Sequence, residues 1–249
     1  MGLGGLSGGS GWKRNLLFLT RVSCYKVRED LRKPFDEEIQ AWIDEGILVP
    51  APDEKVSCVI PLMAVEQVSK GKVRPVLDFK QLNRYVSCHT GGSSVCDEAI
   101  RRWRKIGDNL ALLDLRRAYL QLRVDPSLWK HQIVQYEGKY YYLTRLGFGL
   151  SSAPRIMDKI LKAVLELDET IARATDNYLY DIIVTEQVVS AETVRLHLRR
   201  YGLVSKHQVL LQDGAKVLGL AVDRSSDGCL LYTSPSPRDL STSRMPSSA

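Results

Sequence analysis

Two aspartates occupy positions where a carboxylate could hold a metal ion. Asp114 directly follows the apolar run 110–113, which is short enough for a buried strand. Asp181 lies near the middle of 177–185, a segment that predicts a strand, a turn and a second strand. Carboxylate oxygens are hard ligands of the kind that Mg²⁺ prefers. Position alone leaves both residues open, because Asp114 could equally cap a following helix and Asp181 could serve only as a turn residue.

The elements that must position these carboxylates alternate between strands and helices. Pro34 is expected to open the first helix, with Gly46 near its end. The expected order then continues with a hairpin at 56–68 and 73–79, a helix from 94 to 106, a strand at 110–113, a hairpin at 131–137 and 139–145, a helix from 151 to 165, the strands of 177–185, a helix at 190–201 and a strand at 215–222. This pattern favours an α+β fold in which helices pack on one face of a sheet.

Five short motifs occur in order along the chain. They are KVRPVLDFKQLN at 72–83, LDLRRAYLQL at 113–122, LGFGLSSAP at 146–154, YLYDIIV at 178–184 and LGL at 218–220. Together they resemble the fingers and palm of a reverse transcriptase, of the kind found in retrotransposons and retroviruses, over about residues 30–223. The resemblance implies an α+β right-hand polymerase core with fingers, a palm and no complete thumb. It also implies a mixed or antiparallel palm sheet with helices packed on one face, and RNA-directed DNA polymerase activity.

The resemblance divides the chain into four parts. Residues 1–29 form a Gly-rich leader and N-terminal extension, 30–107 the fingers-like part, 108–223 the palm, and 224–249 a tail that we expect to be disordered. Over about its last 20 residues the tail resembles a translated sequencing adaptor, so we interpret it as an artefact.

A metal site is also implied by the resemblance. In the family pattern Asp114 is a metal ligand and the motif Tyr-x-Asp-Asp supplies two more, so Asp114 and Asp181 are the expected catalytic residues and ligands. They would hold two Mg²⁺ ions, or Mn²⁺, for nucleotidyl transfer onto a primer 3′-OH. Here the first aspartate of that motif is replaced by Tyr180. Because tyrosine is neutral near pH 7 and bulky, we expect impaired polymerisation, and Asp176 lies too far from the turn to replace the missing carboxylate.

Further residues resemble the family's nucleotide-binding groups. Lys72 and Arg74 match the fingers cations that grip the incoming triphosphate, although a charged hairpin edge would have the same sequence. Tyr119 matches the aromatic gate that excludes a ribose 2′-OH, or is a core aromatic residue. Lys206 matches a lysine near the departing pyrophosphate, or is a surface lysine.

Two loops complete the resemblance. Phe148 and Gly149 match the nucleotide-binding loop that passes under the nascent base pair, where glycine permits a close backbone approach. Gly147 stands where the family often has proline. Leu218 and Gly219 match the segment that grips the primer strand.

The composition excludes several classes of protein. The 249 residues are 44% hydrophobic, which rules out full-length disorder. No apolar run approaches the ~18 residues that a membrane span needs. Five irregularly spaced cysteines argue against a disulfide framework. The net charge of +6 is modest, and its clustering into short basic segments is more informative. These segments could contact nucleic acid, although most such runs are simply solvated helix faces.

The expected partners are an RNA or DNA template with a primer, and deoxynucleoside triphosphates, with no membrane. We expect the chain to belong to a larger polyprotein and to act in the cytoplasm, or alternatively in virus-like particles or the nucleus. Two other interpretations stay open. The chain could be a nucleic-acid-binding remnant without catalysis, or a translated pseudogene fragment.

Overall fold

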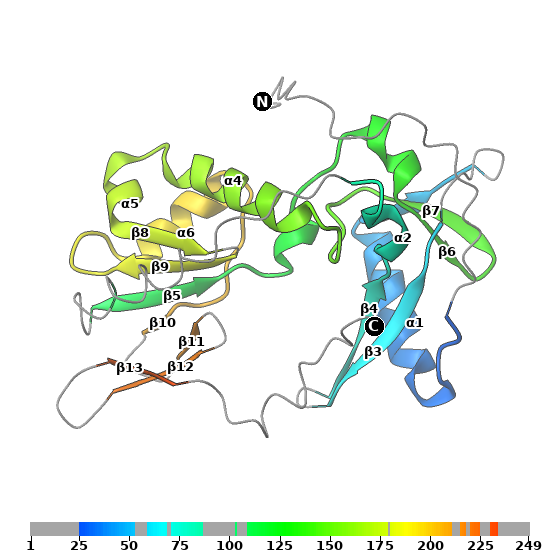
Figure 1. The fold of residues 1–249 in the computed structure, drawn as a ribbon, viewed down its shortest axis with the longest axis horizontal. Coiled ribbons are helices and arrows are strands. Elements are labelled where there is room, and N and C mark those ends of the chain that lie inside the picture. Colours follow the sequence, from blue (N-terminus) through cyan, green and yellow to red (C-terminus); the bar gives the residue numbers. More distant parts are fainter. Residues whose placement is uncertain are drawn as a thin grey trace. The chain divides into compact units, whose positions relative to one another are not determined.

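The computed structural model describes residues 25–52, 59–68, 71–86, 103, 109–178, 180–210, 215–217, 220–224 and 230–233. These residues form two compact units, each with its own sheet (Figure 1). The first unit holds the described residues up to Val86 together with Tyr119–Pro154. The second holds Trp103, 109–118 and the described residues from Arg155 onward.

Helix α1 of the first unit spans Glu29–Asp44 and buries one face. Acidic residues in its first turn favour the positive end of the helix dipole. The sequence pattern placed Pro34 at the start of this helix. In the structure the helix begins at Glu29, and Pro34 lies inside it. Gly46, with φ of 66°, ends the helix, and the N–H of Ile47 donates to the carbonyl of Trp42 at 2.8 Å.

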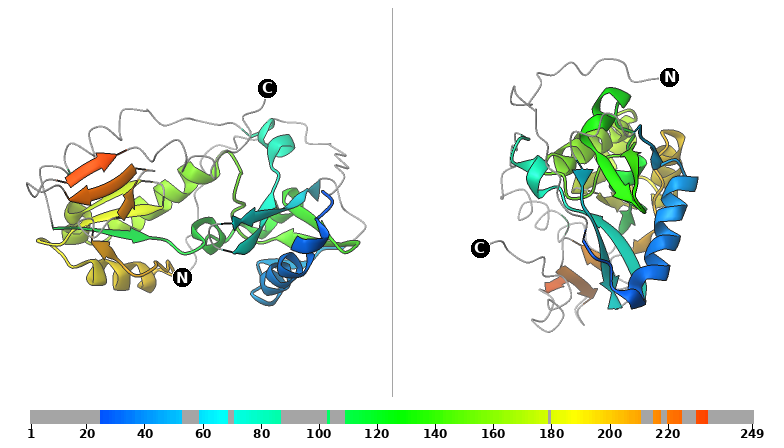
Figure 2. Two further views of the ribbon diagram at one scale, coloured as in Figure 1. Left: turned by 90° about the horizontal axis from the view of Figure 1, so that it is seen from below. Right: turned by 90° about the vertical axis from the view of Figure 1, so that its right-hand side faces the viewer.

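Two β-structures accompany α1 in this unit. A four-stranded sheet has the order β1-β7-β6-β2, with β1 at Leu48–Pro50, β7 at Lys139–Leu143, β6 at Ile133–Tyr136 and β2 at Val59–Ile60. A hairpin of β3 (Leu62–Gln67) and β4 (Lys72–Leu77) lies along α1 (Figure 2). Shorter elements are α2 (Lys80–Asn83) and the 3₁₀ helices η3 (Ala118–Gln121) and η4 (Pro126–His131).

The core of the first unit draws on all of these layers. Its buried apolar side chains come from α1, the hairpin, α2 and the sheet. They are Phe35, Ile39, Trp42, Ile47, Leu48, Ile60, Leu62, Leu77, Phe79, Leu82, Val134 and Leu143.

A four-stranded antiparallel sheet with the order β10-β5-β9-β8 is the base of the second unit. Its strands are β5 (Leu110–Asp114), β8 (Thr175–Tyr178), β9 (Asp181–Thr185) and β10 (Val209–Leu210). Helices α4 (Ala153–Leu165), α5 (Glu169–Ala174) and α6 (Ala191–Arg200) gather on one side of it, and α6 contacts β5 and β9 (Figure 1). This arrangement confirms the predicted α+β fold, with helices packed on one face of an antiparallel sheet.

Three further strands form a second antiparallel sheet in this unit. They are β11 (Ala215–Val217), β12 (Leu220–Arg224) and β13 (Leu230–Thr233). Strand β13 lies inside 224–249, for which the sequence predicts disorder. Its backbone pairs with β12 from Ala221↔Thr233 to Arg224↔Leu230, so these tail residues are part of a sheet. The rest of the predicted tail from 234, and the leader 1–24, lie outside the described residues.

The two units do not coincide with the linear division into 30–107 and 108–223. Residues 119–154 belong to the first unit because β7 pairs with β1, and β6 pairs with β2. The predicted helix from 94 to 106 lies outside the described residues except for Trp103, which is buried.

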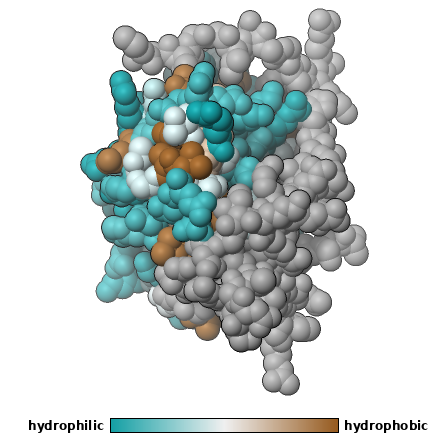
Figure 3. Space-filling view, turned by 90° about the vertical axis from the view of Figure 1, so that its left-hand side faces the viewer, coloured by the Kyte–Doolittle hydropathy of each residue, from teal (hydrophilic) through white to brown (hydrophobic). Residues whose placement is uncertain are grey.

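On one face of the second unit, the residues that the structure describes are mostly hydrophilic (Figure 3). Figure 3 shows the side that faces left in Figure 1, where a small hydrophobic patch is surrounded by hydrophilic residues. Exposed large apolar side chains of this unit include Leu167, Val188 and Leu196, and scattered exposure of this kind is normal. Among the helices of the described residues, none is both long enough and apolar enough to cross a membrane.

Leu113 tests how far the second unit depends on β5. The side chain is fully buried, and its strand partner Ile182 is buried too. We expect Leu113→Ala to lower the free energy of unfolding by about 2–5 kcal/mol, because it leaves a cavity in the sheet core. Urea denaturation would measure this change. The control is Leu196→Ala, whose side chain is 53% exposed on α6 and whose effect should stay within about 0.5 kcal/mol. Equal effects of the two variants would contradict the expected core role of β5.

Candidate active site

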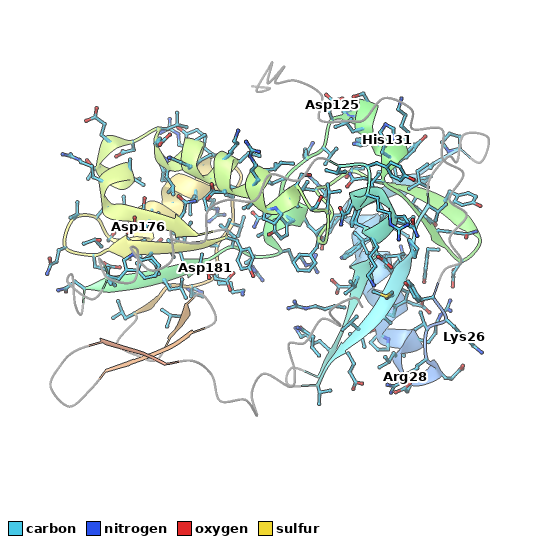
Figure 4. All side chains as sticks on the ribbon, viewed as in Figure 1. Lys26, Arg28, Asp125, His131, Asp176 and Asp181 are labelled. Carbon is cyan, nitrogen blue, oxygen red and sulfur yellow. The ribbon has the colours of Figure 1, made fainter. Side chains whose placement is uncertain are left out.

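Asp114 and Asp181 lie opposite each other at one end of the second unit's sheet. The antiparallel register of β5 and β9 pairs Asp114 with Asp181, just after Leu113 with Ile182. Directly opposed residues of antiparallel strands share a face of the sheet, with Cβ atoms about 4.5–5.5 Å apart. Both aspartates are half-buried, whereas Leu113 and Ile182, the next residues toward the sheet interior, are buried. The strand register thus brings together the two aspartates that the sequence singled out. Figure 4 labels Asp181, at the start of β9.

Tyr180 adjoins both carboxylates. The N–H of Leu115 donates to the Tyr180 carbonyl at 3.3 Å, which ties the turn before β9 to the end of β5. Burial raises the pKa of the Tyr180 hydroxyl, and the negative charges of Asp181 and Asp114 raise that pKa further. The phenol therefore stays protonated at neutral pH. It cannot act as an anionic ligand in place of the aspartate that the family pattern has at this position.

Lys206 reaches Asp114 from another segment of the chain. Its ammonium group donates to Asp114 Oδ2 as an ion pair, and its backbone N–H donates to the Asp114 carbonyl at 2.8 Å. The neighbouring backbone continues the contact, because Ser205 forms a bridge with Leu115. The sequence placed Lys206 near a departing pyrophosphate, and the structure pairs it with the predicted metal ligand Asp114.

The donor set at this end of the sheet suits a hydrated divalent ion. Asp114 and Asp181 supply two carboxylates, and Mg²⁺ typically keeps several waters while binding one or two carboxylates. Within the described part of the chain, no group of three or more His, Cys, Asp or Glu side chains could hold a metal ion. The two carboxylates therefore fit one hydrated ion, while a second ion would need ligands from elsewhere, such as substrate phosphates.

Asp176 is engaged elsewhere on the sheet. It lies on β8 opposite Ile183, which is two residues along β9 from Asp181. The indole N–H of Trp103 donates to Asp176 Oδ2 at 2.8 Å. This contact was not predicted from the sequence, because Trp103 and Asp176 are 73 residues apart. The carboxylate of Asp176 therefore has a structural partner in Trp103.

In the first unit, the two predicted triphosphate-binding cations share one face of a strand. Lys72 and Arg74 alternate with Val73 on β4, and both side chains are exposed. Their strand partners on β3 are Gln67 and Val65. Among the described residues, no ion pair joins Lys72 or Arg74 to an acidic side chain. The pair is thus available to an anionic ligand.

Tyr119 and Phe148 form an aromatic pair in the first unit. Their ring centroids are 5.5 Å apart with a tilt of 54° between the planes. Tyr119 is 7% exposed, whereas Phe148 is 46% exposed. The predicted gate residue is thus largely covered, and the predicted loop residue lies against it.

Asn83 holds the loop that carries Phe148, a role that was not predicted from the sequence. Its side-chain Nδ2 donates to the carbonyl of Gly149 at 2.9 Å, and its Oδ1 accepts from the N–H of Ser151 at 2.8 Å. Gly149 has a φ of 101°, which non-glycine residues rarely adopt. A single amide that carries both a donor and an acceptor can fasten a loop in this way. The only signal in the sequence was an Asn at the end of a motif.

Gly147 is packed against Phe79 at the start of the same loop. A Cβ atom added at Gly147 would collide with the Phe79 ring, which is 1% exposed and belongs to the core. Glycine, in place of the proline that the family often has, therefore fits the space that the Phe79 ring leaves at this position. The remaining predicted residues, Leu218 and Gly219, lie outside the described residues.

Comparisons with known proteins give one weak relative in sequence. No protein-family model matches the chain. An uncharacterised protein of Caenorhabditis elegans, K02A2.6, is 27% identical over 136 residues, which cover 52% of this chain and 10% of that protein. The chain therefore spans about a tenth of that relative's length.

Solved structures of foamy virus proteins share the fold. A foamy viral protease-reverse transcriptase in complex with double-stranded DNA matches 91% of this chain and 46% of that chain, with a TM-score of 0.67 and 18% identity. A related complex, of the form named dRH, covers 81% and 35% with a TM-score of 0.66 and 18% identity. The native prototype foamy virus protease-reverse transcriptase covers 80% and 26% with a TM-score of 0.64 and 20% identity.

These likenesses concern the fold. The chain spans less than half the length of each of these solved chains, and the identities are low. Its described α+β architecture matches the polymerase core of these reverse transcriptases.

The contact between Gly147 and Phe79 can be tested by a double-mutant cycle. We expect Gly147→Ala to lower the free energy of unfolding by about 1–3 kcal/mol, because the added methyl group overpacks the site. In a Phe79→Leu background the same change should cost less, since the aromatic ring is gone. Urea denaturation of the four proteins would measure the coupling. An equal cost in both backgrounds would mean that the Phe79 ring does not limit the size of the side chain at residue 147.

Proposed function

We propose that this chain is the RNA-directed DNA polymerase domain of a retroelement and that its activity is impaired by Tyr180. The observation that carries the proposal is the pairing of Asp114 with Asp181 at the end of β5 and β9. Two further observations support it. The five sequence motifs occur in order, and the fold is like that of foamy viral reverse transcriptases.

The proposed roles follow from the chemistry of each side chain. Asp114 and Asp181 would hold Mg²⁺ or Mn²⁺, which would align the primer 3′-oxygen and stabilise the leaving pyrophosphate. Lys72 and Arg74 would bind the triphosphate of the incoming deoxynucleotide, since ammonium and guanidinium groups form strong charge-assisted bonds to phosphate. Tyr119 would exclude a ribose 2′-OH.

The loop that carries Phe148 and Gly149 would pass beneath the nascent base pair. The rings of Tyr119 and Phe148 lie against each other, which supports a gate residue and a loop that lie side by side. Asn83 would keep the loop in place through its two hydrogen bonds.

The proposed partners are a template with a primer, in a larger protein. Two of the solved relatives are in complex with double-stranded DNA, and all are named protease-reverse transcriptases. By analogy, this chain would bind a primer–template and would belong to a polyprotein. We also propose that it acts in the cytoplasm.

A second candidate function is nucleic-acid binding without catalysis. Two observations favour it: a neutral phenol occupies the position of a ligand carboxylate, and the other ligand, Asp114, is already paired with Lys206. Exposed cations such as Lys72 and Arg74 would still contact phosphates.

Primer extension on an RNA template with Mg²⁺ separates these functions. We expect Tyr180→Asp to extend the primer at least about 100-fold faster than the unaltered chain, because a restored ligand is worth several kcal/mol and each ~1.4 kcal/mol is tenfold in rate. Tyr180→Asn is the matched control, since it removes the ring without adding a charge. It should remain slow.

Asp114→Asn in the Tyr180→Asp background should abolish extension again. Rapid extension by the unaltered chain would contradict the proposed impairment, and no extension by Tyr180→Asp would contradict the proposed polymerase. Because Asp-to-Tyr requires a single base change, re-reading the nucleotide sequence at codon 180 would decide whether Tyr180 is genuine.

The binding function predicts a steep salt dependence. Affinity for a primer–template duplex should fall by at least tenfold between about 50 and 200 mM salt, because phosphate contacts release counterions. Arg74→Gln should reduce both the affinity and the slope, and fluorescence anisotropy would measure both quantities. Arg173→Gln, in α5, is the control and should change neither. Weak binding without salt dependence would contradict both candidate functions and would favour the pseudogene fragment.

A further inference from the structure

We propose that Lys206 is the resident counter-ion of Asp114 and that it competes with a divalent cation for this carboxylate. The inference rests on the proposed function, in which Asp114 and Asp181 are metal ligands. Lys206 would act as this counter-ion before any substrate binds. In this chain, the lysine lowers the metal affinity of its own active site.

The backbone fixes Lys206 beside Asp114. Its N–H donates to the Asp114 carbonyl at 2.8 Å, and the N–H of Arg116 donates to the carbonyl of Val204 at 2.9 Å. A bridge between Leu115 and Ser205 lies between these two bonds. Because the main chain of Lys206 is held by this short ladder, its ammonium group stays within reach of the carboxylate.

The side chain of Lys206 can nevertheless leave the ion pair. It is 55% exposed, while that of Asp114 is 33% exposed. A lysine side chain has a long and flexible stem, so the ammonium group can turn into solvent while the backbone stays in place. An arriving cation can therefore displace the ammonium group without unfolding the strand end.

The charges at this end of the sheet explain why the competition matters here. Asp114 and Asp181 lie opposite each other on β5 and β9, and the Lys206 ammonium group pairs with Asp114. The family pattern would add a third negative charge at residue 180. Without it, the ion pair with Lys206 offsets the negative charge of Asp114, one of the two carboxylates proposed to attract a divalent ion.

The experiment measures Mn²⁺ binding to the full chain by isothermal titration calorimetry. We expect Lys206→Met to lower the Kd for Mn²⁺ by about 3- to 5-fold, the scale of a partly exposed ion pair. Lys206→Arg keeps the charge and should bind Mn²⁺ as the unaltered chain does. The matched control is Lys162→Met, since Lys162 pairs with Glu166 at 3.8 Å on the exposed side of α4, and it should leave the Kd unchanged.

Two results would overturn the inference alone. One is an unchanged or higher Kd in Lys206→Met, while Tyr180→Asp binds Mn²⁺ and Asp114→Asn does not. The other is a Kd in Lys206→Arg that falls as far as in Lys206→Met, because the positive charge would then not be the cause. If neither the unaltered chain nor Tyr180→Asp binds Mn²⁺ in a manner that depends on Asp114, the proposed metal site fails and the inference fails with it.

Discussion

The register between β5 and β9 is the constraint on which the candidate site depends. Side chains alternate between the two faces of a strand, so a slip of one residue would move Asp114 away from Asp181. Apolar residues occupy the rest of β5, and Ile182, Ile183 and Val184 are buried on β9. Shifting the strands would bring an aspartate into this core, so burial selects the register that brings the two carboxylates together.

The sequence predicts those parts of the site that depend on local patterns. The strand before Asp114, the hairpin around Asp181 and the substitution at Tyr180 can all be read from short segments. Contacts between distant segments could not be predicted: Lys206 and Asp114 are 92 residues apart, and Asn83 and Gly149 are 66 residues apart. Neither contact has a periodic signature, because each depends on how complete elements pack.

Local packing also explains one departure from the family pattern. Gly147 lies against the ring of Phe79, and Asn83 fastens the next turn of the loop. Proline would stiffen this loop through its own ring, whereas here the loop is held by one aromatic side chain and one amide. The residue at 147 therefore has to be interpreted together with Phe79, and not by itself.

The discontinuous construction of the second unit has a consequence for biosynthesis. Strand β5 leaves the ribosome well before β9, because residues 119–154 between them belong to the other unit. At translation rates of about 5–20 residues per second, its apolar run stays without a neighbouring strand for several seconds. Unpaired apolar strands are prone to aggregate during this interval. Chaperones that bind short apolar segments would therefore raise the yield of folded protein.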